Sequence, residues 1–298
     1  MSLARNPRAA FWGWVRPTSS SALLALTVAC AGGQRPPPKA ESGTTIQGPA
    51  GKLRVSDGGQ SGGMPVILVH GLGSSWEVWR AALDHLRPER RATALDLRGH
   101  GDSDGPATEA GYSIEGLAED IDAVAQSLGL KRFVLVGHSL AGAALTAYAA
   151  RHPEKIAGLV YVDAIGDFHK LPKEALDKML AEDAKGIDVR AAYEPLLGAK
   201  ARPQTRVQVQ AAAARMKPGA FAGLRRAAFG YDAAADVRGY SGPVAFIEAG
   251  PQLPIFASAA VGRAPRRTLD DVSHWLMLDD PAGFARLLDD ALSGMEKQ

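Results

Sequence analysis

The 298-residue sequence has a single cysteine, Cys30, so the chain cannot form an intramolecular disulfide bond. The apolar run near the N-terminus, residues 22–29, is too short to span a bilayer as a helix. No basic stretch is interleaved with aromatic residues and the net charge is only +2, which argues against a nucleic-acid partner. The sequence also lacks a metal-ligand cluster and a dinucleotide-binding glycine fingerprint. We therefore expect no metal and no cofactor, and nothing indicates an obligate protein partner.

The composition is that of a globular protein, with 46% apolar and 22% charged residues. The length suits one large α/β domain or two smaller ones and can bury a substantial core. Export is expected from the first 31 residues, where Arg5, Arg8 and Arg16 precede the apolar run, as in a signal peptide.

Two endings of this signal remain open. Residues 29–31 (ACA) fit a small-residue cleavage site, which would release a periplasmic or secreted protein. Alternatively, LTVAC resembles a bacterial lipobox, in which Cys30 would carry the lipid and tether the mature protein to a membrane. Thr27 departs from that pattern, because a lipobox usually has Leu or Val there. Residues 32–50 are rich in Gly, Pro, Ser and Thr and are expected to form a flexible tether.

Strand-like and helix-like patterns alternate through the rest of the chain. Apolar runs typical of buried strands are at residues 65–69, 92–97, 132–136, 157–162 and 244–247. Helical patterns between and after them are at residues 76–86, 114–128, 140–150 and 282–292. This alternation predicts an α/β fold in which helices cover both faces of a mostly parallel sheet. Residues 51–163 and 242–298 would form this core, and residues 164–241, with helical patterns at 173–184 and 208–215, an inserted helical cap.

The strongest chemical signal is FVLVGHSLAGAA, residues 133–144. An apolar strand runs through Gly137 and His138 to Ser139, and a small-residue helix follows. The stretch resembles the nucleophile elbow of the α/β-hydrolase family, in which a serine projects from a sharp strand-to-helix turn. Ala141 stands where that motif usually has glycine, and Gly142 follows it. The simpler interpretation is that Ser139 only caps the helix.

Two glycine-rich turns resemble motifs of the same family. In HGLG, residues 70–73, the resemblance implies that the backbone N–H of Leu72 and that of Leu140 form the oxyanion hole, with His70 shaping the turn. DLRGHGDSD, residues 96–104, matches a loop that is structural in the family, so no catalytic role is expected for His100. His274, shortly before the last helix, has the position of the family's triad histidine. The resemblance covers residues 51–293 and implies an α/β-hydrolase fold with a helical cap.

The triad carboxylate is the least determined part of the site. The family often places it after the strand that follows the cap, but Leu253 occupies that position. One hypothesis assigns the role to Asp163, at the end of LVYV before the cap, where some lipases and haloalkane dehalogenases carry their acid. Another assigns it to Glu248, or to an aspartate at 167, 270 or 271. A third holds that the triad is incomplete.

The resemblance implies an exported serine hydrolase that cleaves a small carboxylic ester or lactone through an acyl-enzyme intermediate. A serine at the elbow argues against epoxide hydrolase and dehalogenase chemistry, for which this family uses an aspartate. Hydrolysis of C–C bonds or thioesters, perhydrolysis, and a tethered binding protein without turnover remain alternatives. Aromatic side chains of the cap would line an apolar acyl pocket or only pack the cap's own core: Phe168, Tyr193, Phe221, Phe229 and Tyr231. Trp76 and Trp79 are expected to pack behind the HGLG turn.

Overall fold

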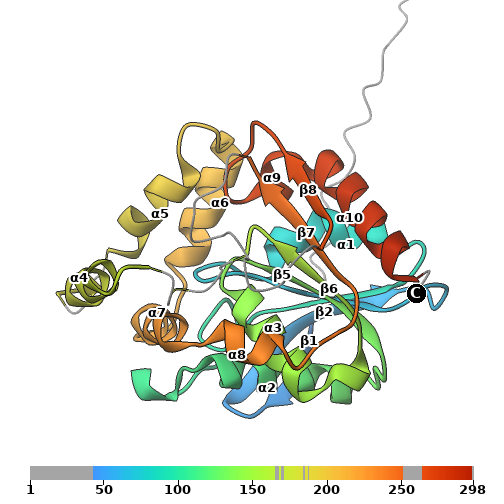
Figure 1. Cartoon of the computed structure of the whole chain (residues 1–298), viewed down its shortest axis with the longest axis horizontal. Helices are drawn as coiled ribbons and strands as arrows, with labels where there is room; N and C mark the ends of the chain where they lie inside the picture. Colours follow the sequence, from blue (N-terminus) through green and yellow to red (C-terminus); the bar gives the residue numbers. More distant parts are fainter. Residues whose placement is uncertain are drawn as a thin grey trace, which may run out of the picture. The chain divides into compact units, whose positions relative to one another are not determined.

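The computed structural model describes residues 43–164, 168, 171–183, 185–186, 188–250 and 264–296. Its centre is an eight-stranded sheet in the order β1-β2-β4-β3-β5-β6-β7-β8. The pairs β1–β2 and β2–β4 are antiparallel, and the other neighbours are parallel (Figure 1). The strands are β1 (Thr44–Gly48), β2 (Gly51–Gly59), β3 (Val66–Val69), β4 (Arg91–Leu95), β5 (Phe133–His138), β6 (Ile156–Val162), β7 (Val244–Ala249) and β8 (Arg266–Leu269). The predicted α/β class, with a mostly parallel sheet, is confirmed.

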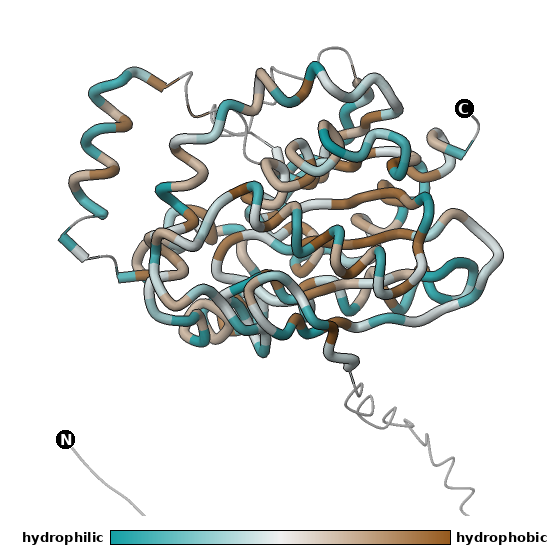
Figure 2. The backbone as a smooth tube through the Cα atoms, turned by 90° about the horizontal axis from the view of Figure 1, so that it is seen from below, coloured by the Kyte–Doolittle hydropathy of each residue, from teal (hydrophilic) through white to brown (hydrophobic). Residues whose placement is uncertain are grey.

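The central strands are buried on both faces, which is why they are continuous apolar runs and do not alternate with polar residues. In β3, Ile67 and Val69 enter one core cluster, while Val66 and Leu68 enter the cluster on the opposite face. Figure 2 shows these hydrophobic segments gathered in the interior, with more hydrophilic stretches on the surrounding helices. Two apolar faces require two helical layers to cover them.

Each face of the sheet has its own helices (Figure 1). One face is covered by α2 (Ile114–Ser127) and α3 (Ala141–Arg151), and α8 (Ala233–Val237) packs on α3. The other is covered by α1 (Arg80–Leu86) and α10 (Pro281–Glu296). Short helical turns complete this part of the chain: η1 (Trp76–Trp79), η2 (Glu109–Gly111), η3 (Pro153–Lys155) and α9 (Leu276–Asp279).

The helices between β6 and β7 agree with the predicted helical insertion and extend it. They are α4 (Lys173–Asp183), α5 (Val189–Leu197), α6 (Pro203–Ala213), α7 (Ala220–Gly230) and α8. Sequence periodicity indicated only α4 and α6. One side of α5 and one side of α7 are buried, through Tyr193 and Leu197 in α5 and Phe221 and Leu224 among others in α7, whereas α4 buries no residue.

The predicted tether over residues 32–50 is wrong for its last part. Thr44–Gly48 forms β1, which pairs along its whole length with β2 and closes one edge of the sheet. Ile46 is 5% exposed, so this polar segment gains one anchored side chain and a ladder of backbone hydrogen bonds. The proposed signal peptide, with Cys30 and residues 32–42 of the tether, lies outside the described residues. No described helix combines the length and apolar character needed to cross a membrane.

The predicted strand over residues 92–97 ends earlier, at Leu95. Asp96 follows the strand, and its carboxylate accepts a hydrogen bond from the backbone N–H of Trp76 (2.7 Å) and another from that of Asp102 (3.0 Å). This residue therefore fastens two loops at the carboxyl edge of the sheet. The ends of β3, β5, β6, β7 and β8 lead to the same edge, which gathers the residues of the site.

Candidate active site

Ser139 lies on a sharp turn between β5 and α3. Its φ of 53° is in the left-handed region, which non-glycine residues seldom adopt. The turn is held by the Ser139 backbone N–H, which donates to the carbonyl of Val162 (3.1 Å), and by the N–H of Gly142, which donates to the carbonyl of Ser139 (2.9 Å). At Gly137 any Cβ would lie 2.5 Å from a methyl carbon of Leu145, so glycine is what lets α3 approach the strand.

Asp163 and His274 form a buried pair beside this turn. His274 Nδ1 lies 2.7 Å from Asp163 Oδ2, and the two residues are 6% and 5% exposed. The other carboxylate oxygen, Oδ1, accepts a hydrogen bond from the N–H of Ala249 at the end of β7 (3.2 Å). A carboxylate at Nδ1 favours the tautomer with its proton on that nitrogen, so the basic lone pair of the His274 ring is on Nε2.

The other candidate carboxylates have different surroundings. Glu248 is buried on β7 and pairs with Arg266 of the neighbouring strand β8. Asp270 and Asp271 are exposed, and Asp271 lies 3.7 Å from Lys200. Asp167 and Leu253 lie outside the described residues. Of the described candidates, the structure brings only Asp163 against His274.

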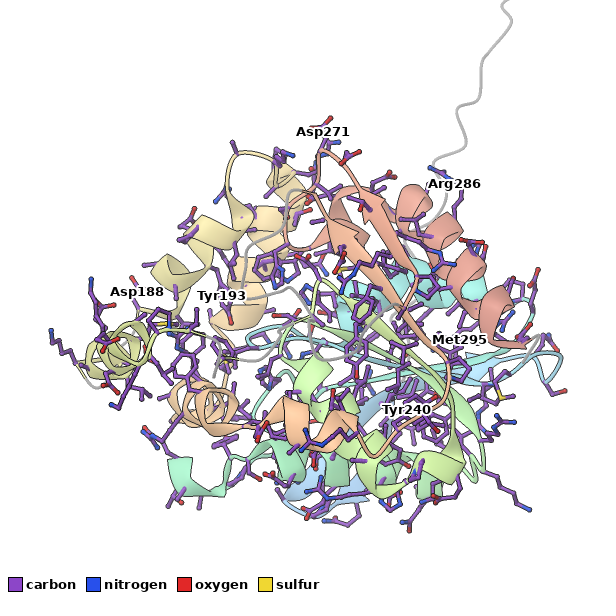
Figure 3. All side chains as sticks on the ribbon, viewed as in Figure 1. Asp188, Tyr193, Tyr240, Asp271, Arg286 and Met295 are labelled. Carbon is purple, nitrogen blue, oxygen red and sulfur yellow. The ribbon has the colours of Figure 1, made fainter. Side chains whose placement is uncertain are left out.

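The backbone N–H groups of Leu72 and Leu140 are those expected to form an oxyanion hole. Neither has a protein acceptor among the residues that the structure describes. The HGLG turn is close to the serine, because a Cβ on Gly71 would lie 2.7 Å from Cβ of Ser139. The turn is fixed from two sides. The Tyr193 hydroxyl donates to the Leu72 carbonyl (2.8 Å), and the N–H of Gly73 donates to Nε2 of His100 (3.0 Å). Figure 3 shows Tyr193 reaching from the cap towards the sheet.

His70 and His100 are structural, as the sequence predicts. Each is fully buried and accepts a backbone N–H at Nε2, from Leu97 for His70 (3.1 Å) and from Gly73 for His100. Burial holds the pKa of His70 well below its usual value and lowers that of His100 to about 4. Both rings are therefore neutral at pH 7 and serve as hydrogen-bond acceptors in the loops around the site.

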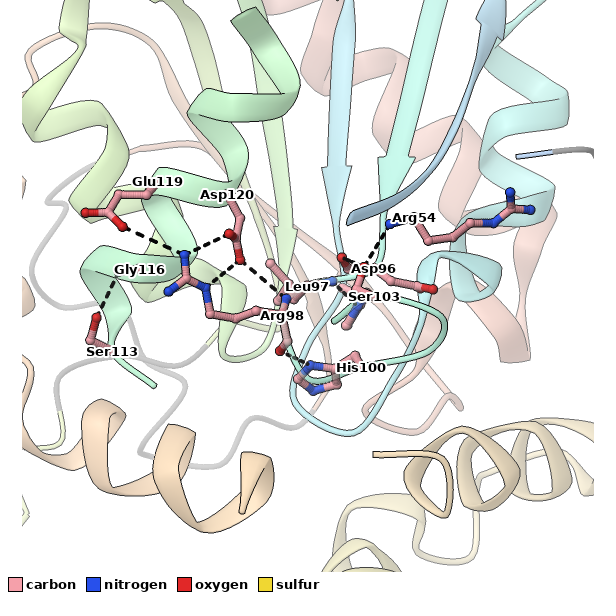
Figure 4. Close-up of polar contacts among 11 residues, drawn as sticks. Arg54, Asp96, Leu97, Arg98, His100, Ser103, Ser113, Gly116, Glu119 and Asp120 are labelled. Atoms are coloured by element: carbon pink, nitrogen blue, oxygen red, sulfur yellow. Dashed lines mark hydrogen bonds and ion pairs between the residues drawn. The ribbon is translucent and has the colours of Figure 1, made fainter. Parts of the chain in front are cut away.

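The loop after β4 is tied to α2 by a buried ion pair (Figure 4). The Arg98 guanidinium donates two hydrogen bonds to the Asp120 carboxylate, both 2.8 Å, and the Arg98 backbone N–H donates a third (3.3 Å). Ser103 extends the network by donating to the Asp96 carbonyl (2.7 Å) and accepting from the Arg54 N–H (2.9 Å). This loop orders the site's surroundings without facing the serine.

A cavity of about 200 Å³ joins these elements. Core residues contribute Leu72, His138, Ser139, Leu140, His274 and Trp275 to its wall. The cap contributes Phe168, Met179, Ala192, Tyr193, Pro195, Leu196, Phe221, Arg225, Ala228 and Phe229. Four of the five aromatic cap residues singled out from the sequence thus line the cavity, and they also pack on one another, with Phe168 against Phe229 (4.8 Å between ring centroids). The Tyr231 side chain does not line the cavity, and its hydroxyl donates a hydrogen bond to Asp236 Oδ2 (2.7 Å).

Sequence reasoning missed several wall residues. His138, next to the serine, donates from Nε2 to the His274 carbonyl (2.8 Å), and its ring lies against that of His274 with the ring centroids 4.4 Å apart and the planes tilted by 41°. Trp275 lies in the wall, whereas Trp76 and Trp79 pack outside it, Trp79 against Phe284. Arg225 had no sequence signal, because it is one of several arginines on cap helices.

In the described part of the chain no group of three or more His, Cys, Asp or Glu side chains could hold a metal ion.

Comparison with known proteins agrees with this architecture. Residues 64–182 match the family model for the alpha/beta hydrolase fold. Epoxide hydrolase 4 of Mus musculus is 37% identical over 105 residues, which are 35% of this chain and 29% of that protein. The 2-hydroxy-6-oxo-2,4-heptadienoate hydrolase of Pseudomonas putida is 32% identical over 136 residues, 45% of each protein. The matches thus cover less than half the length of either relative.

A solved structure extends the likeness in fold to most of the chain. The thermophilic esterase from Thermogutta terrifontis superimposes with a TM-score of 0.72 at 21% identity, covering 85% of this chain and 99% of that one. The elbow, the sheet order and the family match over residues 64–182 together show that the chain has the α/β-hydrolase fold.

Proposed function

We propose that the protein is a serine hydrolase that cleaves a small carboxylic ester or lactone. The observation that carries the proposal is the strained elbow that holds Ser139 in one cavity with His274, whose Nδ1 is paired with Asp163. A serine at the elbow also separates this chain from the activity named for its relative epoxide hydrolase 4, since that chemistry uses an aspartate at this position in the family.

The reaction proceeds in two halves. His274 Nε2 takes the hydroxyl proton as Ser139 Oγ attacks the acyl carbonyl, and the amides of Leu72 and Leu140 stabilise the oxyanion. The intermediate collapses, the C–O bond to the alcohol breaks, and His274 gives its proton to the leaving alkoxide. Water then attacks the acyl carbonyl while His274 takes its proton. The C–O bond to Ser139 breaks, His274 returns the proton to Ser139 Oγ, and the carboxylic acid leaves. Asp163 stabilises the imidazolium in both halves.

The test is labelling by a fluorophosphonate probe together with hydrolysis of p-nitrophenyl butyrate. We expect labelling at Ser139 in the wild type, and a loss of about 10⁶-fold in kcat in Ser139→Ala. A folded wild type that is neither labelled nor active would support the alternative of a binding protein without turnover.

Hydrolysis of a C–C bond is a second candidate, favoured by the relative named 2-hydroxy-6-oxo-2,4-heptadienoate hydrolase. It uses the same serine, so the probe does not separate the two. A panel that pairs simple esters and lactones with a vinylogous 1,5-diketone does, because a C–C hydrolase turns over the diketone faster.

We also propose export, on the sequence of residues 1–31 alone. Mass spectrometry of the mature N-terminus and membrane fractionation test it. A lipidated Cys30 predicts a membrane-bound protein that Cys30→Ser releases, whereas cleavage after Ala31 predicts a protein without lipid. An intact N-terminus found in the cytosol would contradict both.

A further inference from the structure

Arg225, on α7, is the only permanently charged side chain among the described residues that line the catalytic cavity. Most of the remaining wall is apolar or aromatic. A single cation in such a wall is costly to bury unless it has partners, and it is an obvious place for an anionic part of a ligand.

The position of the Arg225 side chain is fixed by the cap. Its Nε donates to Oδ2 of Asp183 at 2.7 Å. The guanidinium carbon lies 5.0 Å from the ring centroid of Phe229 and 5.6 Å from that of Phe221. Three contacts therefore hold the planar group in place before any ligand arrives, which reduces the entropy lost on binding.

The two terminal nitrogens of this guanidinium have no acceptor among the described residues. Asp183 engages only Nε, so the N–H groups of Nη1 and Nη2 remain available. The side chain is 24% exposed, and its charge also reaches the cavity's tyrosine: burial raises the pKa of Tyr193, and Arg225 opposes that rise. A planar pair of donors matches the two oxygens of a carboxylate.

We propose that Arg225 forms a carboxylate-binding subsite, so that the preferred substrate is an ester or lactone whose short acyl group carries a second, free carboxylate. The inference rests on the proposed function for the position of the reacting carbonyl at Ser139. The apolar wall between these residues would contact the methylene groups that join the two ends of the acyl chain.

Kinetics on matched substrate pairs test this subsite with the full-length protein. Monomethyl succinate, glutarate and adipate are compared with methyl butyrate, valerate and hexanoate, in which a methyl group replaces the free carboxylate. The measured quantity is the ratio of kcat/KM for the acid to that for its neutral partner. The three chain lengths identify the spacing between Ser139 and Arg225.

We expect Arg225→Met to lower this ratio about 10- to 100-fold, the size of a charge-assisted hydrogen bond. Arg225→Lys should restore part of it, and Asp183→Asn should raise it by removing the competing negative charge. Arg226→Met is the matched control, because Arg226 is on the same helix but pairs with Glu109 (2.8 Å) and does not line this cavity. It should leave the ratio unchanged.

A ratio in Arg225→Met within threefold of wild type would overturn the subsite while leaving the proposed function intact. If Arg225→Met does not fold, the other two variants decide, because Arg225→Lys should lower the ratio of kcat/KM values and Asp183→Asn should raise it. Calorimetric titration with glutarate needs no turnover, so it still tests the subsite if the proposed hydrolase activity fails. Binding by wild type that weakens about 10-fold or more in Arg225→Lys supports the subsite, and no binding by wild type overturns it.

Discussion

His274 Nδ1 and Asp163 Oδ2 lie 2.7 Å apart although the residues are 111 positions apart in the chain. The whole cap separates them in sequence, while in space the ends of β6 and β8 bring them to one edge of the sheet. The contact predicts that Asp163→Asn lowers kcat for p-nitrophenyl butyrate about 10³- to 10⁴-fold, because the histidine loses its preferred tautomer and the charge that stabilises its protonated form.

Glu248→Gln is the matched control for that substitution. Glu248 is equally buried but pairs with Arg266, so its loss should lower stability and leave kcat within a few fold of wild type. A large loss of activity in Glu248→Gln with near-normal activity in Asp163→Asn would reverse the two assignments.

How far the sequence could predict this site depends on how local each part is. Ser139 and the Leu72 turn are each contained in a short contiguous motif. About a dozen residues are therefore enough to predict the secondary structure around each of them and its role. The carboxylate is not local: Asp163 and Glu248 both stand at or near the end of an apolar strand. Only the pairing of β7 with β8, which gives Glu248 its arginine partner, and the reach of the His274 loop distinguish them.

The sequence also could not predict the parts of the fold that depend on contacts between distant segments. TTIQG has little apolar character, and Thr44–Gly48 is a strand because β2 offers an edge to pair with. The contacts of Tyr193 and Arg225 arise from the packing of cap helices against the core, and helix periodicity does not specify that packing. Sequence patterns therefore predicted the cap and offered its aromatic residues as candidates for the pocket wall, but they did not predict Arg225 or the contact of Tyr193 with Leu72.

The hydroxyl of Tyr193 is predicted to position the oxyanion turn. Tyr193→Phe keeps the ring contacts with Phe221 and Trp275 but removes the hydrogen bond to the Leu72 carbonyl. One such bond is worth about 0.5–1.5 kcal/mol, so kcat should fall about 2- to 10-fold with little change in KM.

Tyr240→Phe provides the comparison, since its hydroxyl also bonds a backbone carbonyl, that of Pro243 (3.3 Å), but outside the cavity. Steady-state kinetics and thermal unfolding of both variants separate positioning from stability. If Tyr193→Phe changes only the melting temperature, as Tyr240→Phe is expected to do, Tyr193 serves cap packing alone.

Acid should destabilise the protein through its buried histidines. Burial lowers the pKa of His100 to about 4, and the pKa values of His70 and His138 are also lowered, so the native state binds fewer protons than the unfolded state below about pH 6.5. Stability is therefore fully present above that pH and falls as pH drops towards 4, by about 1.4 kcal/mol per pH unit for each histidine.

Asp96 acts in the opposite direction. Burial raises its pKa to about 6, so between about pH 4 and 6 the native state binds its proton more tightly than the unfolded state and gains stability as pH falls. Urea unfolding from pH 7 to 4 should show a net loss of stability. His100→Gln, which keeps an acceptor for the Gly73 N–H, should reduce that slope by about one proton. A slope equal to that of wild type would mean that His100 does not contribute.

The last prediction concerns two neighbouring carboxylates on α2 that face the same arginine. Asp120 is buried and makes two 2.8 Å hydrogen bonds to the Arg98 guanidinium, whereas Glu119 lies 3.8 Å away with its side chain 62% exposed (Figure 4). Asp120→Asn leaves a buried cation without its counter-charge, which should lower the free energy of unfolding by about 3–5 kcal/mol. Glu119→Gln should cost less than about 1 kcal/mol, because water screens the exposed pair. Urea unfolding of both variants at pH 7 compares them directly, and equal losses would show that burial does not set the value of these two contacts.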